Sequence, residues 1–504
     1  MDALQVIFAV IPILWLIIAL STSLFKVHVT SMIALTITML LAFAFFKMTF
    51  QDVATATLEG FLLGLWPILA VIIAAIFTYK LSIHTKSMDL IKTMLSGIST
   101  DRRIQVLILA WGFGGFLEAI SGYGTSVAIP ASILIVLGFE PLFAAVICLV
   151  ANTVPTAYGA VGIAVTTLSK VTGLEVNQLN FYIAIQLAVF IIIFPFLLVI
   201  ITGKGFKALK GVVGITLVSG VAFVIPQLLC ATFLSEQLPT LAGSLCSLGA
   251  TILWSNLFHK DKKAKASEKI PGKKLLLAWL PYILIFFFII VTSPLFAPIS
   301  QFLDHIKTEI TIYTGKNPSL LTFKWINSPG TLIFLAAVIG GLFQGAKILE
   351  ILRIFFATLE QMWRSSITVL SIVAVARVMG YSGMIASIAS LLVNSTGTFY
   401  PFFSPFIGTL GTFLTGSDTS SNILFGALQK ESALLIHANP YWIAASNTAG
   451  ATAGKMISPQ NIAIATSVAN LVGFEGKIFR KTIGYCLLYV VLLGILIFVG
   501  SKFV

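Results

Sequence analysis

Runs of about 20 apolar residues recur along the whole chain, and they constrain its fold more than any other feature. A helix of that length crosses about 30 Å of hydrocarbon. The 504 residues are 58% hydrophobic and only 10% charged, whereas a soluble globular protein carries about 25% charged residues. The sequence therefore predicts an all-α polytopic membrane protein, and it disfavours a soluble enzyme, a secreted protein and a nucleic-acid-binding protein.

About twelve apolar runs are predicted to be transmembrane helices. Two further apolar segments, 104–138 and 401–437, are interrupted near their middles by Gly, Ser and Pro, so each is predicted to be a re-entrant hairpin. The first basic residue, Lys26, follows the first run, so we expect that run to be retained as a span and not cleaved as a signal. The predicted spans are 5–24, 29–46, 57–79, 140–170, 179–202, 210–230, 239–258, 275–295, 330–345, 360–382, 440–470 and 483–501.

The net charge of +13 is concentrated in short loops, and this predicts the orientation of the chain. Seven lysines lie between positions 260 and 274, and loops rich in Lys and Arg stay in the cytoplasm. With loop 259–274 in the cytoplasm, the segment 80–103 is a second cytoplasmic loop and both termini are external. The expected location is the plasma membrane, with anionic lipid headgroups as partners of the basic loops.

Short stretches recur about 300 residues apart in the same order, which indicates an internal repeat. The segment 80–103 carries five Lys and Arg residues, whereas its match, 378–400, carries none. Basic loops that match neutral ones indicate that the two copies have opposite orientations, as in many secondary transporters. Glu59 and Glu360 end two matched ATLE stretches and are predicted to cap helix N-termini. The matches are ATLE at 56–59 and 357–360, FL at 116–117 and 413–414, NT with a later Gly at 152–159 and 447–454, and VTGLE and LVGFE at 171–175 and 471–475.

The repeat predicts how the chain is divided. The predicted parts are an N-terminal span at 1–28, a first inverted repeat at 29–203 with hairpin 104–138 and broken helix 140–170, connecting helices at 204–329 with the basic loop 259–274, and a second inverted repeat at 330–504 with hairpin 401–437 and broken helix 440–470.

Four polar clusters interrupt the apolar spans, at 116–126, 151–162, 413–422 and 446–460. Non-helical backbone at this depth must be buried in protein or line a polar cavity, and opened helix N-termini favour an anionic solute. The alternative is that these small residues only permit close helix packing. The predicted substrate-binding residues of the clusters are Ser121, Gly122, Tyr123, Thr125, Asn152, Thr153, Ser417, Thr419, Ser421, Asn422, Asn447 and Thr448.

Charged residues within the spans are the candidates for coupling and for substrate charge. Glu118 and Asp418 lie at the two hairpin tips and are predicted proton carriers, or else structural carboxylates that hold the tips. Lys455 is predicted to bind a substrate carboxylate, with a structural salt bridge to Asp418 as the alternative. Arg377 is a second candidate for a substrate contact, or else extends to the membrane interface.

These clusters resemble the bacterial L-lactate permease family over most of the chain. The matching stretches are FLEAISGYGTSVAIPASILIVLGFEPLFAAVICLVANTVPTAYGAVGI, GSDTSSNILFGALQ and NTAGATAGKMISPQNIA. The resemblance implies uptake of lactate, and of glycolate, in symport with protons. It also implies two inverted hairpin-containing repeats with an elevator-like transport domain, and it is compatible with a homodimer.

Two details of the resemblance bear on the ion and the substrate. The Ser-Asn-Thr motif of sodium-coupled relatives is kept at Ser446-Asn447-Thr448, but the hairpin reads Ser417-Asp418-Thr419, which favours protons. The family stretch FLEGAAGFGAP is replaced here by FLEAISGYGTS, and the added hydroxyls admit another hydroxy acid or a dicarboxylate.

Three functions are therefore compared. The first is a proton-coupled carrier of lactate and related 2-hydroxymonocarboxylates, and the second is a sodium-coupled carrier of dicarboxylates on the same fold. The third is a membrane enzyme or sensor, which the sequence disfavours because it contains no nucleophile triad or phosphate loop. The four cysteines show no CxxC spacing, so neither a metal site nor a cofactor is predicted.

Overall fold

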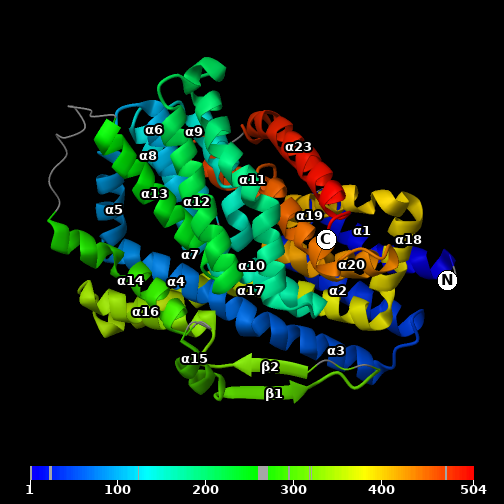
Figure 1. Ribbon diagram of the computed structural model, residues 1–504. Coiled ribbons are helices and arrows are strands. Elements are labelled where there is room, and N and C mark those ends of the chain that lie inside the picture. The colour runs from blue at the N-terminus through cyan, green and yellow to red at the C-terminus, as the bar shows by residue number, and fades with distance from the viewer. Residues whose placement is uncertain are drawn as a thin grey trace.

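The computed structural model describes residues 3–21, 25–122, 124–258, 271–292, 296–316, 318, 320–471 and 474–504. About 82% of the protein is helical (Figure 1). Among the described residues, nine helices are long and apolar enough to cross a membrane, or ten if one bent pair is a single span. The protein is thus an all-α polytopic membrane protein, as predicted; the number of twelve spans and the re-entrant geometry remain predictions.

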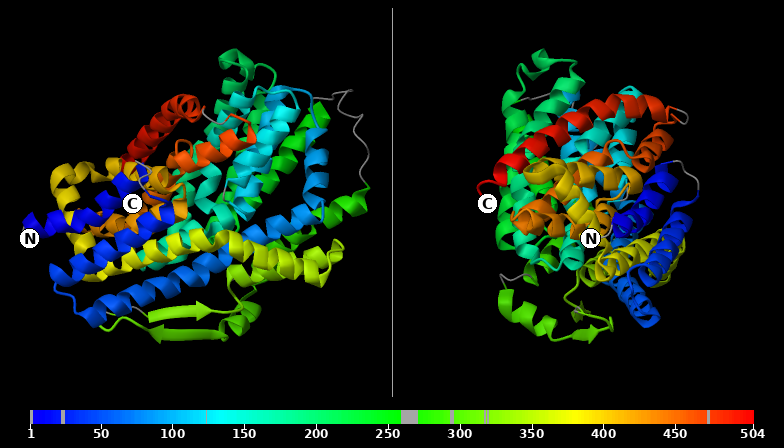
Figure 2. Two further views of the ribbon diagram at one scale, coloured as in Figure 1. Left: turned by 180° about the vertical axis from the view of Figure 1, so that it is seen from behind. Right: turned by 90° about the vertical axis from the view of Figure 1, so that its right-hand side faces the viewer.

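Two long rods form one side of the molecule and run side by side (Figures 1 and 2). The first consists of α3 (Phe50–Leu63), the π-helical segment η1 (Gly64–Leu69) and α4 (Ala70–His84); the second is α17 (Ile348–Ser382). They are antiparallel, because the Lys80 Nζ donates to the Ala357 carbonyl over 3.3 Å while the Tyr381 hydroxyl donates to Glu59 over 2.8 Å. Helix α2 (Val27–Ala44) packs on α17, and α16 (Pro329–Phe343) packs on α4.

The rods begin earlier than the apolar pattern predicts, and this corrects the role of two acidic residues. The Thr49 hydroxyl caps α3 by accepting from the Asp52 backbone N–H over 3.1 Å. Glu59 is therefore a fully buried residue inside α3, and Glu360 is an exposed residue inside α17. The prediction that they cap helix N-termini is wrong, because hydropathy marks only the apolar centre of a helix whose ends are polar.

The remaining helices of the first half lie in the order that the polar interruptions predict. The hairpin segment consists of two arms around a turn at 121–124, and the broken helix is bent by 51° between Ala151 and Val154. The elements are α1 (Ala3–Ser21), α5 (Ser87–Ser96), α6 (Arg102–Val106), η2 (Leu107–Phe113), α7 (Gly114–Ile120), α8 (Thr125–Val136), α9 (Pro141–Ala151), η3 (Val154–Tyr158), α10 (Gly159–Thr172) and α11 (Val176–Thr202).

In the second half, a series of shorter helices follows the rod α17. Helix α19 packs closely on α21 and α23, and α11 of the first half also packs on α21. The elements are α18 (Met384–Thr396), η7 (Gly397–Phe399), α19 (Tyr400–Thr415), α20 (Asp418–Leu435), α21 (Pro440–Lys455), α22 (Pro459–Val468) and α23 (Glu475–Gly500).

The segment between the halves divides into parts that pack on different neighbours. Helices α12 (Val213–Phe233) and α13 (Pro239–Phe258), which follow the short η4 (Phe206–Leu209), pack against α11, η2 and α7. Helix α14 (Gly272–Val291) instead packs on α16 and α5. Most of the predicted basic loop 259–274 lies outside the described residues.

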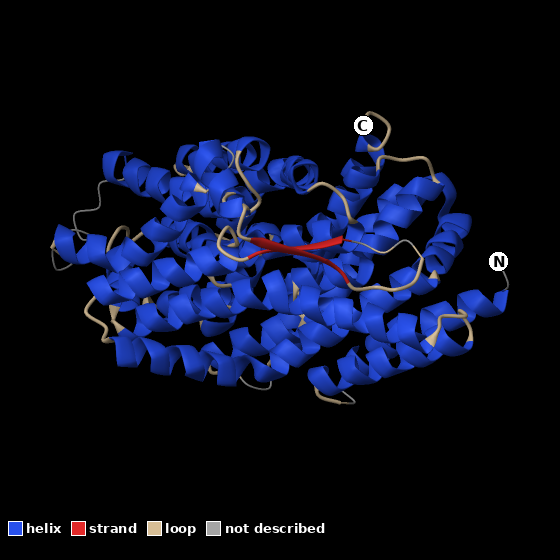
Figure 3. Cartoon of the chain, turned by 90° about the horizontal axis from the view of Figure 1, so that it is seen from below, coloured by secondary structure: helices blue, strands red, loops and turns tan. Residues whose placement is uncertain are grey.

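Several elements, α5 and a β-hairpin among them, occupy segments where the sequence predicts loops. Helix α5 lies within the predicted loop 80–103 and buries Met88, Ile91 and Leu95, a short apolar face among charged residues. After α15 (Ala297–Asp304), the antiparallel strands β1 (Lys307–Thr311) and β2 (Leu320–Lys324) pair Lys307 with Lys324. Figure 3 shows this hairpin lying lengthwise over the helices, and the Trp66 indole N–H anchors it by donating to the Lys324 carbonyl over 3.0 Å.

Candidate functional site

The first hairpin places Glu118 inside the protein. Helix α7 ends at Ile120, the chain turns through Gly122 and Gly124, and α8 begins at Thr125. Glu118 lies on the last turn of α7 and is only 2% exposed. A carboxylate in such a place requires partners, because an unpaired buried charge is strongly destabilising.

Both halves of the chain supply those partners. The Ser126 hydroxyl donates to Glu118 Oε2 over 2.5 Å, and the Asn152 Nδ2 donates to the same oxygen over 3.1 Å. The Lys455 Nζ lies 3.4 Å from Glu118 Oε1, and the side chain of Lys455 is itself only 8% exposed. A buried ion pair therefore joins the first hairpin to α21, across more than 300 residues of sequence.

The break between α9 and α10 has an unusual backbone conformation. Ala160, Val161 and Gly162 have φ angles of +44°, +57° and +72°. Only glycine adopts such angles readily, and each strained non-glycine residue costs about 1–3 kcal/mol. Position 162 also requires glycine for space, because a Cβ there would lie 2.0 Å from the Glu236 carbonyl oxygen. Strain of this kind persists where the surroundings enforce it, and here it interrupts the first turn of α10.

The second hairpin places Asp418 at the first residue of α20. The Ser417 hydroxyl caps this helix by accepting from the Ser420 backbone N–H over 3.3 Å. Asp418 is 4% exposed, and its Oδ1 accepts from the Thr412 hydroxyl over 3.1 Å. Its Oδ2 is buried and, among the described residues, has no hydrogen-bond partner. A solute or a proton can satisfy this oxygen.

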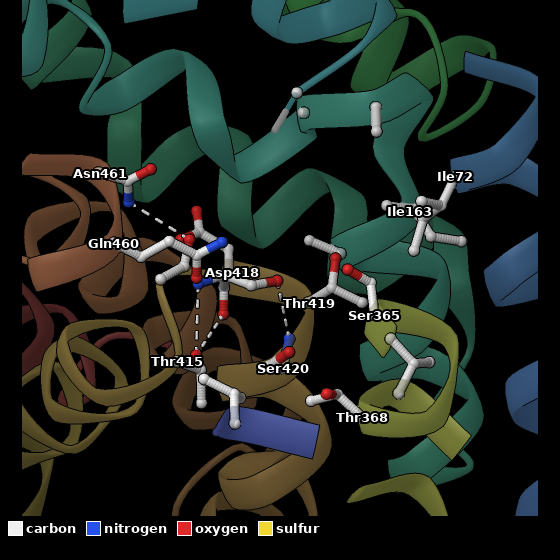
Figure 4. A pocket seen from close by; sticks show the side chains of 18 of the residues that line it. Ile72, Ile163, Ser365, Thr368, Thr415, Asp418, Thr419, Ser420, Gln460 and Asn461 are labelled. Atoms are coloured by element: carbon white, nitrogen blue, oxygen red, sulfur yellow. Dashed lines mark hydrogen bonds between the residues drawn. The ribbon is translucent and has the colours of Figure 1, made fainter. Parts of the chain in front are cut away.

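These parts surround one cavity of about 530 Å³, which we call the central cavity (Figure 4). Figure 4 shows Asp418 and Thr419 on one side, with Ser365 and Thr368 of α17 on the other. The lining residues come from α2, α4, the first hairpin, α10, α17, the second hairpin and the α21–α22 junction. A rod helix and both hairpins thus share one polar space.

Six predicted site residues line the central cavity, and the others lie behind it or elsewhere. The lining set is Glu118, Gly122, Ser417, Asp418, Thr419 and Lys455. Asn152 does not line the cavity but donates a hydrogen bond to Glu118, and the Thr153 hydroxyl donates to the Leu149 carbonyl over 3.4 Å. Ser121 and Thr125 hydrogen-bond to each other over 2.5 Å. Tyr123 lies outside the described residues.

Four predicted residues form a separate buried network. The Asn447 Nδ2 donates to Asn422 Oδ1 over 2.9 Å, and the Asn422 Nδ2 donates to the Thr448 hydroxyl over 2.8 Å. Gln429 Nε2 donates to Asn447 Oδ1 over 3.1 Å, while the Ser421 hydroxyl donates to the Gly408 carbonyl over 2.8 Å. Both amide oxygens already accept hydrogen bonds, so this network joins α20 to α21 rather than facing the cavity.

The two predicted cation contacts have different outcomes. Lys455 lines the central cavity, and the structure pairs it with Glu118 instead of the alternative partner Asp418. Arg377 is placed away from the cavity lining: its Nε lies 3.4 Å from Glu59 Oε1, and its Nη2 donates to the Lys170 carbonyl over 3.0 Å.

Sequence reasoning missed the residues that α17 and the start of α2 contribute. Arg364, Ser365 and Thr368 are polar residues inside a predicted span, which is the same signal that identified the four clusters. Lys26 and His28 lie beside a predicted span; the sequence singles out Lys26 only as the first basic residue, and it does not single out His28. Thr156 and Gly159 lie within a predicted cluster without having been singled out.

Comparisons with known proteins match this chain to one family along its sequence. The profile of a family described as L-lactate permease matches residues 5–504. An L-lactate permease of Streptococcus iniae is 50% identical over 447 residues, covering 88% of this chain and 94% of that protein. Glycolate permease GlcA of Escherichia coli K12 is 33% identical over an alignment of 533 residues, covering 98% and 95%. Among solved structures, Neisseria gonorrhoeae MtrF, described as one of a class of antimetabolite efflux pumps, aligns with a TM-score of 0.47 and 12% identity over 88% of this chain and 83% of that one.

Proposed function

Because this chain belongs to the L-lactate permease family, we propose that it imports L-lactate, and also D-lactate or glycolate, in symport with protons. Relatives named for lactate and for glycolate both match most of the chain. The central cavity supports the proposal because it contains a cation for a carboxylate together with two titratable acids.

The Glu118–Lys455 ion pair is the observation that carries the proposal. Lys455 is a buried cation in the cavity lining, and its Nζ is paired with Glu118 Oε1 at 3.4 Å. A substrate carboxylate competes with Glu118 for the same ammonium group. When the substrate carboxylate binds Lys455, Glu118 loses its ion-pair partner inside a buried site. A proton on Glu118 or Asp418 then compensates for the added negative charge.

The charge balance of the site gives the reason for coupling. Glu118, Asp418 and Lys455 together carry one net negative charge when all are ionised. Binding of a monocarboxylate alone makes the net charge of these groups two negative charges. This is unfavourable because the site is buried: Asp418 is 4% exposed and Glu118 is 2% exposed. Carboxylate and proton entering together leave the net charge unchanged, so each promotes the binding of the other.

The sodium-coupled alternative needs oxygen ligands that are free to bind a cation. The amide oxygens of Asn422 and Asn447 instead accept hydrogen bonds from within their own network. Sodium at that position would require the network to open, whereas Asp418 Oδ2 is ready to take a proton. This comparison favours the proton.

We further propose that the two halves are inverted repeats and that the hairpins and broken helices move against the rods. The central cavity lies between α17 and the second hairpin, which is where such a movement would carry a bound solute from one side of the membrane to the other. The external position of both termini belongs to the same proposal.

Uptake into proteoliposomes tests the function. Labelled lactate should accumulate when an inward proton gradient is imposed, and replacing sodium by choline should not change the rate.

Lys455→Met should abolish uptake, whereas Lys481→Met, at an exposed position on α23, should not. Asp418→Asn and Glu118→Gln are measured separately, and both should still exchange lactate across the membrane. The variant that removes the proton carrier should in addition lose proton-driven accumulation of lactate. Uptake that ignores the pH gradient would refute proton symport, and uptake that requires sodium would support the alternative.

A further inference from the structure

Three basic side chains share the central cavity with Lys455 but have no role in the site described so far. Lys26 and His28 lie at the start of α2, and Arg364 lies on α17. We call them the outer cluster. They come from two elements far apart in sequence that pack against each other, so the fold gathers positive charge on one part of the cavity lining.

The charges of the outer cluster are not neutralised by acidic neighbours. Among the described residues, no carboxylate oxygen lies within 4.0 Å of a side-chain nitrogen of Lys26, His28 or Arg364. Two members of the outer cluster lie beside an indole: Arg364 Cζ lies 5.2 Å from the ring centroid of Trp363, and the centroid of the His28 ring lies 5.6 Å from it. An aromatic ring holds a cation in place without cancelling its charge.

Polar donors accompany the outer cluster on α17. Thr368 lies one helical turn beyond Arg364 and so shares its face, with Ser365 beside it. Figure 4 shows Ser365 and Thr368 across the cavity from Thr419 and Ser420 of the second hairpin. A small oxygenated anion near Arg364 therefore meets hydroxyl groups from both walls.

We propose that the outer cluster is a second binding site for the substrate carboxylate, on the path between Lys455 and one side of the membrane. This inference rests on the proposed function. Lys455 is engaged by Glu118, whereas Lys26 and Arg364 lie at exposed positions and have no carboxylate partner among the described residues. A local group of unpaired positive charges concentrates anions beside it and speeds their arrival.

Initial rates of lactate uptake at fixed pH test the proposal. Arg364→Gln should raise KM by about tenfold at low ionic strength, the lower end of the rate effects attributed to electrostatic steering, with little change in the maximal rate. Added KCl should raise KM in the parent protein and much less in Arg364→Gln, because salt screens the charge that the variant lacks. Lys26→Gln should act in the same direction, and Arg364→Lys should retain most of the parent's behaviour.

The matched control is Arg353→Gln, which removes the same charge from the same helix at an exposed position outside the cavity lining. Thermal stability of each purified variant separates misfolding from lost binding. If Arg364→Gln and Arg353→Gln have equal KM values and equal salt dependence, or if Arg364→Lys is as defective as Arg364→Gln, the outer site does not exist. A parent protein that takes up neither lactate nor glycolate would instead refute the proposed function.

Discussion

At the scale of single residues, Gly159 shows how closely the central cavity is built around one carboxylate. A Cβ at this position would lie 2.6 Å from Glu118 Oε1, which is also the oxygen that faces Lys455. Glu118 has a flexible side chain, so Gly159→Ala should displace its carboxylate at little loss of stability. We expect lactate uptake to fall by at least tenfold, because displacing an ion pair by 1 Å weakens interactions that depend on orientation.

The control for this substitution is Gly249→Ala in α13, where an added Cβ has no heavy atom within 4 Å. It should leave both uptake and thermal stability unchanged. Normal uptake by Gly159→Ala would show that the position of the Glu118 carboxylate does not matter for transport, and the mechanism based on its pairing with Lys455 would have to be abandoned.

At the scale of secondary-structure elements, the two rods are joined by a buried ion pair. Glu59 of α3 is fully buried and pairs with Arg377 of α17, which also donates to the Lys170 carbonyl at the end of α10. Glu59→Gln leaves the buried guanidinium without its carboxylate and should lower the free energy of unfolding by about 3–5 kcal/mol. Thermal unfolding of the purified protein would report the loss as a lower Tm.

The predicted repeat suggests the matched control, since Glu360 ends the second ATLE stretch as Glu59 ends the first, but Glu360 is exposed. Glu360→Gln should leave the Tm within error of the parent. The double variant Glu59→Leu/Arg377→Met, which removes both charges, should be more stable than Glu59→Gln alone. Equal Tm values for Glu59→Gln and Glu360→Gln would mean that the ion pair does not stabilise the packing of the rods.

The elements also show which parts of the fold are readable from sequence. Apolar length predicts the helices well, because crossing hydrocarbon demands it. It misplaces the start of α3 at residue 57, when the helix begins at Phe50, since Gln51 and Asp52 give no apolar signal. It also misses α5 and the β-hairpin, because neither contains a long apolar run. Contacts with distant segments hold them in place, such as the hydrogen bond between Trp66 and Lys324.

The central cavity was predictable where polar residues interrupt an apolar run. That signal locates Glu118, Asp418 and Lys455, all of which line the cavity. It cannot tell which polar side chains satisfy each other: Asn422 and Asn447 are predicted to bind the substrate, and the structure shows in addition that they hydrogen-bond to each other over 2.9 Å. Partner choice depends on three-dimensional packing, which one-dimensional spacing does not encode.

At the scale of the whole molecule, the cavity is shared between segments that must separate if the hairpins move against the rods. Ser365 belongs to the rod α17, and Thr419 belongs to the second hairpin across the cavity (Figure 4). Thr55 of the rod α3 and Thr314, by contrast, lie outside the cavity lining, and their hydroxyl oxygens are 3.1 Å apart. The first pair therefore reports movement across the cavity, and the second pair is its control.

Cysteine cross-linking tests this movement. In a background with the exposed Cys246 replaced by serine, Ser365→Cys/Thr419→Cys should lose lactate uptake when bridged by a short bifunctional thiol reagent. Bridging Thr55→Cys/Thr314→Cys should leave uptake largely intact, because these hydrogen-bonded positions lie together outside the cavity lining. Mass spectrometry would verify bridging in both variants, and a reagent with a reducible linker should allow uptake to recover. If the bridged 365–419 variant still transports at the parent rate, the cavity does not lie at a moving boundary, and the substrate must cross between fixed helices instead.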